Sequence, residues 1–382
     1  MKMVIAPQAF KGSISALDAA RAIACGAHQV FPHAELVKVP VADGGDGTLD
    51  VLLNATGGMV NDAIVSGPLG TPVTARWGVL GDGRTAIIEA AQACGLSLLS
   101  EKDKNPVKTS TYGVGELISL ALNAGYRRII IGLGGTSTND GGSGLASALG
   151  VSFLNANGVE IGQGGGELID LALIDQSGLD PRIRETVFIA ATDVTNPLCG
   201  PMGAAATFGP QKGATPKDLR NLDLALSHFA DVIQHDVGID VTTVPGGGAA
   251  GGMGAGLFAF LGARIEWGAN IVCNAVGLER HLVGAGLVIT GEGQLDWQTA
   301  YNKAPVVVSH HAVANFIPVL GVAGLLGKGW KRLYAEGFTA MKSMVSGPVS
   351  LNQALQFPEK PLIRATVLGL QSLIRRYPNN FW

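Results

Sequence analysis

The chain has 382 residues, of which 47% are hydrophobic and 15% are charged, and its formal net charge is −3. Its length corresponds to about two or three domains of ordinary size, and its charge gives no electrostatic indication of nucleic-acid binding. The 55 glycines are roughly twice the usual share. This composition favours an α/β enzyme with many close backbone approaches over a repeat protein or a disordered one.

Three features concern the cellular location. The four cysteines are widely separated and form no C-x-x-C motif, so neither a zinc site nor a redox pair is indicated. The N-terminus lacks the long apolar segment of a signal peptide. The uncharged run 304–327 contains two histidines, an asparagine and the mid-run Pro318, which argue against a membrane span because polar groups are costly in lipid. We therefore expect a cytoplasmic protein that does not cross a membrane.

Apolar runs of strand length alternate with helical patterns along the chain. Most of the apolar runs are continuous, as expected for strands covered on both faces, and the alternation predicts parallel, doubly wound sheets. Strands are predicted at 3–6, 36–41, 85–90, 128–133, 187–192, 287–290, 318–323 and 338–345. Helices are predicted at 15–30, 112–123, 216–234 and 304–315, the first of them opening with the capping pattern Ser15-x-x-Asp18.

The first candidate site lies in the loop between the first predicted strand and the first predicted helix. Lys11 and Ser13 stand just before the helix start, where backbone N–H groups and a lysine can hold an anionic substrate or a phosphate. The alternative is a lysine that is simply solvated.

The second candidate site is VPVADGGDGT, residues 39–48. Asp43, Gly44 and Gly45 follow a predicted strand, and a carboxylate in that place can hold Mg²⁺ or orient a hydroxyl group. Asp43 or Asp46 could equally cap the helix that follows. The sequence alone does not decide between these interpretations.

The most informative segment is IIIGLGGTSTNDGGSG, residues 129–144. Its three isoleucines predict a buried strand, its last residues begin a short predicted helix, and a glycine-rich polar loop lies between them. A loop from a strand to a helix start is where α/β proteins bind anions. The predicted ligand-binding residues of this loop are Gly134, Gly135, Ser137, Asn139, Asp140, Gly141 and Gly142.

Two later segments repeat the pattern of a strand followed by acidic residues. Asp193 directly follows a predicted strand and can take a proton from a substrate alcohol or bind a metal, with an Asx turn as the alternative. Glu292, Asp296 and Lys303 follow a later strand and a glycine loop, and they suit a metal–phosphate site. A surface ion pair is the alternative there. The G-x-G-x-x-G at 246–251 lies in no clear βαβ unit and does not indicate a dinucleotide fold.

Taken together, these segments resemble the bacterial glycerate kinase family, of type I and glycerate 2-kinase-like, almost from end to end. So many motifs in the same order are far more specific than one glycine-rich loop. The motifs are KGS at 11–13, PVADGGDGT at 40–48, SGPLG at 66–70, TSTYGVGEL at 109–117, GLGGTSTNDGG at 132–142, TDVTNPL at 192–198, FGPQKGA at 208–214, GGGAAGGMG at 246–254 and ITGEGQLDWQT at 289–299.

The resemblance implies two α/β domains with mainly parallel sheets and an active-site cleft between them. A flavodoxin-like domain, residues 68–288, would be inserted into a discontinuous, Rossmann-like three-layer domain of residues 1–67 and 289–382. The implied reaction is phosphorylation of D-glycerate by ATP with Mg²⁺, most often at the 2-hydroxyl to give 2-phosphoglycerate, in the breakdown of sugar acids. The implied partner is this small molecule, without nucleic acid or membrane, and a homodimer is left open.

Under this resemblance each candidate residue takes a hypothetical role. Asp193, Lys11 and Asp296 are the predicted catalytic residues, and Asp193 and Asp43 are the predicted metal ligands. Lys303 joins the 134–142 loop as a predicted contact of ATP. The residues predicted to contact glycerate are Ser13, Asp43, Gly44, Gly45 and Glu292.

The sequence departs from the family pattern in three segments, the first of which reads Pro7-Gln8-Ala9 where the family usually has proline, aspartate and serine. Gln8 stands where the family usually has aspartate, Trp297 where it has a small residue, and Asn302 where it has glycine. Two alternatives therefore stay open: a catalytically impaired, kinase-like protein that binds a small acid or a nucleotide, and a kinase with an altered hydroxy-acid acceptor.

Overall fold

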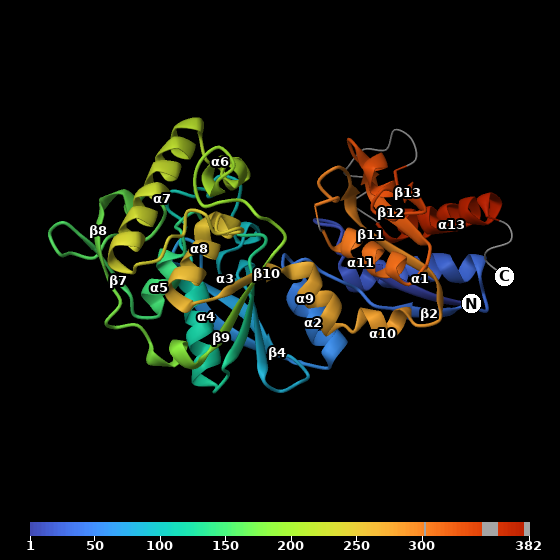
Figure 1. Cartoon of the computed structure of the whole chain (residues 1–382), viewed down its shortest axis with the longest axis horizontal. Helices are drawn as coiled ribbons and strands as arrows, with labels where there is room; N and C mark the ends of the chain where they lie inside the picture. The colour runs from blue at the N-terminus through green and yellow to red at the C-terminus, as the bar shows by residue number, and fades with distance from the viewer. Residues whose placement is uncertain (302, 346–357, 378–382) are drawn as a thin grey trace. The chain divides into compact units, whose positions relative to one another are not determined.

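The computed structural model describes residues 1–301, 303–345 and 358–377 (Figure 1). Its contacts divide the chain into two compact units, of which the first comprises residues 1–55 with 269–382 and the second residues 56–268. Both units are α/β structures, as predicted, and each is described by itself below.

The units divide the chain earlier than the domain boundaries predicted from the sequence, which lay at 67/68 and 288/289. At the first boundary the reason is a strand that the sequence analysis did not predict, β3 (Met59–Ser66). This strand pairs along its whole length with β4 (Pro72–Val79) in the sheet of the second unit. At the second boundary, residues from Ala269 onward belong to the first unit.

The first unit is built on five parallel strands in the order β13-β12-β11-β1-β2. The chain runs from β1 to β2 on one side and from β11 through β12 to β13 on the other, so the strand order reverses between β1 and β11. In open α/β sheets, ligands bind outside the carboxyl ends of the strands at such a reversal. The strands are β1 (Lys2–Pro7), β2 (Glu35–Lys38), β11 (Ala285–Leu295), β12 (Val319–Leu326) and β13 (Ala340–Ser343).

Helices cover both faces of this sheet. On one face α1 (Ala16–Val30) packs along α13 (Glu359–Arg376), and Met3 and Ile5 of β1 belong to the same apolar core as these helices. Successive side chains of a strand point to opposite faces, so the equally buried Val4 lies on the other face. There α11 contacts β1, β11 and β12. The remaining elements of this unit are α2 (Thr48–Thr56), α9 (Gly268–Ala275), α10 (Leu278–Leu282), α11 (Ala304–Ala314) and η5 (Trp330–Tyr334).

The structure corrects one expectation about the segment LVITGEGQL. The glycines after residue 290 were predicted to form a loop, whereas β11 continues to Leu295 and pairs in parallel with β12. The physical reason is a close strand approach: a Cβ atom on Gly291 would lie 1.7 Å from the carbonyl oxygen of Val322. Glycine at this position permits the pairing of the strands and does not interrupt it.

The second unit contains a mixed, six-stranded sheet in the order β10-β9-β6-β5-β4-β3. The strands β5, β6, β9 and β10 are parallel neighbours and follow one another in chain order, while β4 and β3 are antiparallel. The predicted flavodoxin-like order, in which parallel strands reverse across the sheet, is therefore not observed, because the β3–β4 hairpin occupies the edge beside β5. Further strands of this unit are β5 (Thr85–Glu89), β6 (Arg128–Gly132), β7 (Ser152–Asn155), β8 (Leu171–Asp175), β9 (Val187–Thr192) and β10 (Arg264–Trp267).

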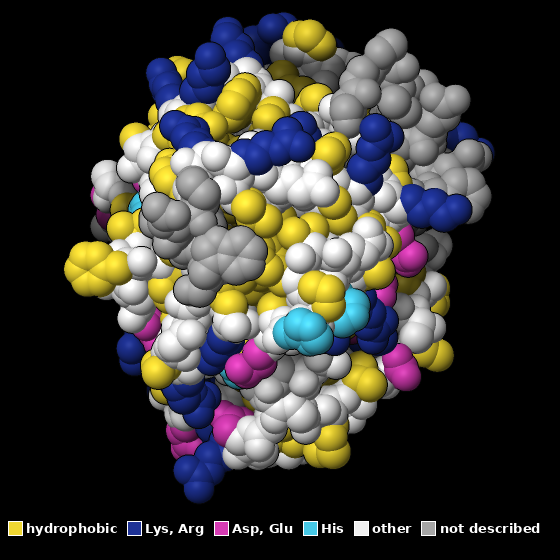
Figure 2. Space-filling model, turned by 90° about the vertical axis from the view of Figure 1, so that its right-hand side faces the viewer, with side chains coloured by type: hydrophobic (Ala, Val, Ile, Leu, Met, Phe, Trp, Pro, Cys, Tyr) yellow, Lys and Arg dark blue, Asp and Glu magenta, His cyan; other side chains and the backbone are white. Residues whose placement is uncertain are grey.

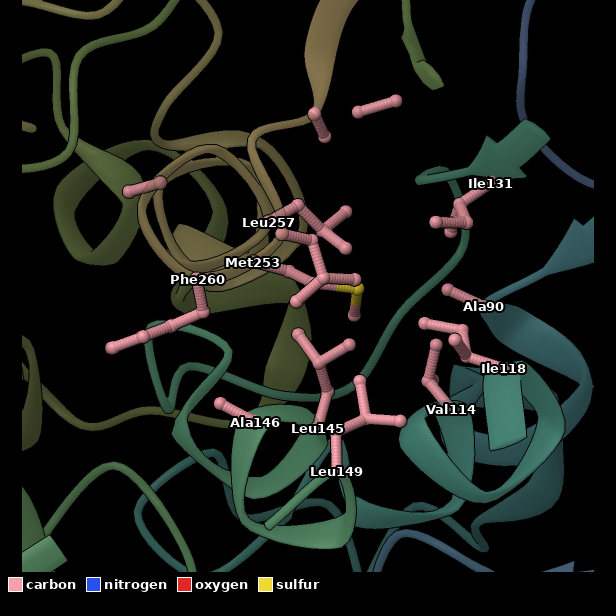
Figure 3. Packing of buried hydrophobic residues seen from close by; sticks show 14 of the residues in the cluster. Ala90, Val114, Ile118, Ile131, Leu145, Ala146, Leu149, Met253, Leu257 and Phe260 are labelled. Atoms are coloured by element: carbon pink, nitrogen blue, oxygen red, sulfur yellow. The ribbon is translucent and has the colours of Figure 1, made fainter. Parts of the chain in front are cut away.

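The core of the second unit lies between its sheet and its helices. Figure 3 shows Val114, Leu145, Met253 and Leu257 converging from three helices, with Ile131 of β6 beside them. This packing fixes the strand ends and the loops that follow them. The helices are α3 (Ala91–Cys94), η1 (Leu96–Leu98), α4 (Tyr112–Asn123), α5 (Ser143–Ala148), η2 (Glu167–Asp170), η3 (Pro181–Glu185), α6 (Ala204–Phe208), η4 (Pro210–Lys212), α7 (Pro216–Asp236) and α8 (Ala249–Leu261).

One face of the molecule is of mixed character. On the face shown in Figure 2, hydrophobic side chains are interspersed with lysines, arginines, acidic residues and histidines. Among the residues that the structure describes, no helix is both long and apolar enough to cross a membrane.

Candidate functional site

In the first unit, polar side chains gather after the ends of β1 and β2 and on the last part of β11. Gln8 directly follows β1, Asp43 lies in the segment after β2, and Glu292 is next to Gly291, which pairs with Pro7 across the reversal of strand order. Gln8, Asp43 and Glu292 are all buried, with exposed fractions of 3%, 4% and 8%. The sheet therefore places an amide and two carboxyl groups at the edge where ligands bind in such folds.

Gln8 and Asp43 are bonded to each other. The Gln8 Nε2 donates to Asp43 Oδ2 at 2.6 Å, and the backbone N–H of Gly45 donates to Asp43 Oδ1 at 3.1 Å. Asp43 thus holds its own turn and fixes the amide of Gln8, in agreement with a structural contribution to the loop. The Oε1 atom of Gln8 is buried and has no hydrogen-bond partner.

Glu292 lies among several charged groups. Thr299 Oγ1 donates to Glu292 Oε1 at 2.8 Å. Burial raises the pKa of Glu292 to about 7; Asp43 acts in the same direction, while Lys303, the Thr299 hydroxyl and Lys11 oppose it. Three other predicted residues, Lys11, Asp43 and Lys303, thus interact electrostatically with Glu292.

The predicted residues of the first loop, Lys11 and Ser13, precede helix α1. Lys11 is exposed and Ser13 half-buried, and the backbone N–H of Ser13 donates to the carbonyl of Phe10 at 2.9 Å. The helix itself starts as predicted, because Ser15 Oγ caps it by accepting from the N–H of Asp18 at 3.1 Å.

Asp296 is buried and its oxygens serve the local turn. Asp296 Oδ1 accepts from the backbone N–H groups of Gln298 and Thr299, at 2.8 and 3.3 Å, and Oδ2 accepts from Gln294 Nε2 at 2.5 Å. This is the geometry of an Asx turn, and its catalytic role stays a prediction. The neighbouring Trp297 is 41% exposed, and Asn302 lies outside the described residues.

Glu292 gives a prediction for the pH dependence of stability. Because its pKa in the folded protein is above the unfolded value of 4.5, folding favours the protonated form, and its contribution is lost as the pH rises from about 4.5 to about 7. Glu292→Gln removes this titration. We therefore expect the stability of Glu292→Gln relative to the wild type to increase between pH 5 and pH 8, by about 2.5 kcal/mol.

Urea unfolding of both proteins at pH 5 and pH 8 measures this difference. The exposed Glu185 provides the control, since Glu185→Gln should show the same difference from the wild type at both pH values. A Glu292→Gln difference that does not change with pH would contradict the prediction.

In the second unit, three neighbouring parallel strands end in candidate residues. Glu89 is the last residue of β5 and is opposite Gly132, the last residue of β6. Asp193 directly follows β9 and is half-buried. The loop 133–142 starts beside Asp193, because the N–H of Leu133 donates to the carbonyl of Ala191 at 3.0 Å. The carboxyl ends of these strands therefore bring Asp193 next to the start of the predicted ligand loop.

The loop 133–142 is held from several directions. Its residues 136–140 are all buried. The N–H and the Oγ of Ser137 donate to the carbonyl of Cys94, at 2.8 and 2.9 Å, and Thr109 Oγ1 donates to the carbonyl of Ser137 at 2.9 Å. Gly141 and Gly142, at φ 65° and 82°, turn the chain into α5 through a conformation that glycine tolerates best.

The acidic and amide side chains of the loop differ in their partners. Asp140 accepts from the N–H and Oγ1 of Thr111, both at 2.8 Å, and from the N–H of Gly142 at 3.1 Å. Burial raises the pKa of Asp140, although these hydrogen bonds oppose the rise. Asp140 thus holds the loop together. By contrast, neither the Oδ1 nor the Nδ2 of the buried Asn139 has a hydrogen-bond partner.

The comparisons with known proteins cover nearly the whole chain. The profile of the glycerate kinase family matches residues 3–371. The chain belongs to the glycerate kinase family. A glycerate kinase of Bacillus subtilis (strain 168) is 49% identical over 93% of both chains, and a glycerate 2-kinase of Escherichia coli (strain K12) is 48% identical over 96% of both chains. A crystal structure of a candidate glycerate kinase 2 from Salmonella typhimurium LT2 superposes with a TM-score of 0.83, at 45% identity and over 99% of both chains.

Two buried residues of this glycerate kinase family member were missed by the sequence analysis. Glu89 ends an apolar strand. Asp193 was identified as an acidic residue at the end of such a strand, and the same criterion could have found Glu89. Lys212 lies within the FGPQKGA motif, but no local pattern indicates that it is buried. Its Nζ donates to the carbonyl of Thr138 at 2.6 Å and to Thr136 Oγ1 at 3.4 Å.

The predicted residues of the family site fall into two sets, each within one unit. Lys303 was predicted to contact ATP together with the 134–142 loop; within the first unit its charge acts on Glu292, and its contact with ATP stays a prediction. Within the described residues, no group of three or more His, Cys, Asp or Glu could hold a metal. Mg²⁺ is commonly bound by one or two carboxylates together with substrate phosphates. A single carboxylate such as that of Asp193 fits this arrangement. Asp43 already accepts a hydrogen bond at each oxygen.

Proposed function

We propose that this chain transfers the γ-phosphoryl group of ATP to D-glycerate, at the 2-hydroxyl, giving 2-phosphoglycerate and ADP. The observation that carries the proposal is the 48% identity, over 96% of both chains, with a protein named glycerate 2-kinase. Support comes from the buried polar residues at the carboxyl ends of parallel strands in both units. The reversal between β1 and β11 supports a Rossmann-like assignment of the first unit.

In the second unit we assign ATP to the loop 133–142 and the proton of the substrate to Asp193. The 2-hydroxyl oxygen forms a bond to the γ-phosphorus, the bond between this phosphorus and the β–γ bridging oxygen breaks, and Asp193 accepts the hydroxyl proton. Mg²⁺, when bound, would neutralise charge on the phosphates; the alternative role of Asp193 is to hold this ion in place of accepting the proton.

In the first unit we assign glycerate to the residues around Glu292. Lys11 and Ser13 would hold the substrate carboxylate, since a lysine side chain supplies a positive charge and a hydroxyl donates a hydrogen bond. Asp43, Gly44, Gly45 and Glu292 would contact its hydroxyl groups. ATP as the phosphoryl donor accords with the cytoplasmic location expected from the sequence.

Release of ADP in the presence of D-glycerate, ATP and Mg²⁺ tests the activity, and phosphorus NMR of the product identifies the phosphorylated hydroxyl. ADP release that requires glycerate and a 2-phosphoglycerate product are expected. Binding of nucleotide without any ADP release would favour the impaired relative, and turnover only with another hydroxy acid would favour the altered acceptor. The molar mass from light scattering, measured as the protein elutes from a size-exclusion column, tests whether the chain forms a homodimer.

Asn139 provides a test of the nucleotide loop. A buried amide without partners destabilises a protein by about 1–3 kcal/mol for each unpaired group, so an apolar residue of similar size should be tolerated. We expect Asn139→Leu to unfold at the same temperature as the wild type or higher, and to bind ADP at least 10-fold more weakly.

Calorimetric melting and ADP titration measure these two effects. The exposed Asn221 of α7 is the control, since Asn221→Leu should leave ADP affinity unchanged. Unaltered ADP binding by Asn139→Leu would remove this amide from the nucleotide site.

A further inference from the structure

Lys212 is a buried cation for which the proposed mechanism has no role. It is 2% exposed and ends the short helix η4. Its Nζ donates to the carbonyl of Thr138 at 2.6 Å and to Thr136 Oγ1 at 3.4 Å. Among the residues that the structure describes, Lys212 forms no ion pair. Removing an ammonium group from water is costly unless good hydrogen bonds replace its hydration, and here both observed acceptors belong to the loop 133–142.

The same loop also packs against a left-handed turn of α8. Ala250, Gly251 and Gly252 have φ values of 55°, 73° and 91°. A Cβ atom on Gly251 would lie 1.9 Å from the carbonyl oxygen of Thr138, and the N–H of Gly141 donates to the carbonyl of Gly251 at 3.0 Å. The carbonyl of Thr138 is thus in contact with Gly251 while it accepts from Lys212, and the two contacts together define its direction.

Asn139, the next residue, is the part of the loop that points to a ligand. It is fully buried, and neither end of its amide has a protein partner. The peptide that begins with the Thr138 carbonyl ends with the backbone nitrogen of Asn139, so a fixed carbonyl at Thr138 also fixes the backbone from which the Asn139 side chain extends.

We infer that Lys212 is a positioning residue for the nucleotide: its ammonium fixes the Thr138 carbonyl and Thr136 hydroxyl and thereby holds Asn139 and the loop in the binding arrangement. This inference rests on the proposed assignment of ATP to the loop 133–142. It assigns Lys212 no contact with the reacting atoms.

The charge of Lys212 makes the inference testable by pH. Burial lowers the pKa of Lys212 to about 8; the Cys94 sulfur, when deprotonated, and the Asp140 carboxylate act to raise it. Burial also raises the pKa of Cys94 to about 12, so the thiol stays protonated up to pH 9. Loss of the ammonium charge above pH 8 should therefore weaken nucleotide binding. If only the charged form holds the loop, the affinity falls about 10-fold between pH 7 and pH 9.

Calorimetric titration with ADP and Mg²⁺ at pH 7 and pH 9 measures this effect. We expect the wild type to bind about 10-fold more weakly at pH 9, and Lys212→Met to bind at least 10-fold more weakly than the wild type at pH 7 without a further fall. Lys212→Arg should bind equally at both pH values, because arginine keeps its charge. The exposed Lys217 of α7 is the control, and Lys217→Met should behave as the wild type.

Equal ADP affinity of the wild type at both pH values, or of Lys212→Met and the wild type at pH 7, would overturn the inference. If Lys212→Met does not fold, the pH comparison between the wild type and Lys212→Arg decides. If the wild type binds no nucleotide, the proposed function fails separately. In that case the rate of backbone hydrogen exchange in the peptide 133–142 tests the role of Lys212. Unchanged protection of this peptide in folded Lys212→Met would refute a positioning role.

Discussion

Asp193→Asn should lower the turnover number by about 100-fold or more while the fold is retained. Asp193 directly follows β9 and is beside the start of the loop 133–142, where we assign the phosphates of ATP. An asparagine of nearly the same size keeps the packing, but its amide cannot accept the substrate proton. Removal of a general base typically lowers the rate by about 10²–10⁴-fold.

Steady-state ADP release measures the turnover number, and circular dichroism checks the fold. Asp170→Asn, at an exposed position of the same unit, is the matched control and should retain wild-type turnover. Turnover of Asp193→Asn within about threefold of the wild type, with glycerate saturating, would exclude Asp193 from proton transfer.

Gly251→Ala should destabilise the second unit by about 3 kcal/mol or more and abolish nucleotide binding. The φ of Gly251 is +73°, which costs a residue with a Cβ atom about 1–2 kcal/mol. The added carbon would also lie 1.9 Å from the Thr138 carbonyl oxygen and 2.6 Å from the Asn139 Cα. These are backbone atoms, so either α8 or the ligand loop has to move, and overpacking of this kind costs about 1–3 kcal/mol more.

The matched control is Gly262→Ala at the end of α8. Gly262 has φ +62° and no atom within 4 Å of an added Cβ, so this variant isolates the backbone contribution of about 1–2 kcal/mol. Urea unfolding and ADP titration compare the two variants. Equal stability of both, with ADP affinity retained in Gly251→Ala, would show that the loop does not depend on this close approach.

Local patterns were sufficient for the elements whose signals lie within one segment. The helix predicted at 112–123 is α4 (Tyr112–Asn123), and the predicted strand 187–192 is β9. In these segments the run of apolar residues and the terminal turn residues agree, so local preference and tertiary packing favour the same structure. The hairpin of β3 and β4 was missed, since exposed antiparallel strands carry a weaker apolar signal, and so was α13.

The sequence by itself determined the family, the α/β class and the strand-end positions of Asp43, Asp193 and the 134–142 loop, because short motifs and apolar runs encode them locally. Only the tertiary structure decided that β1 pairs with β11, across more than 280 residues, and that the ammonium of Lys212 lies on the Thr138 carbonyl, 74 residues away. Such contacts depend on how whole strands and helices pack. The buried partners of Glu292 and the left-handed turn against the loop therefore become visible only when the chain is folded.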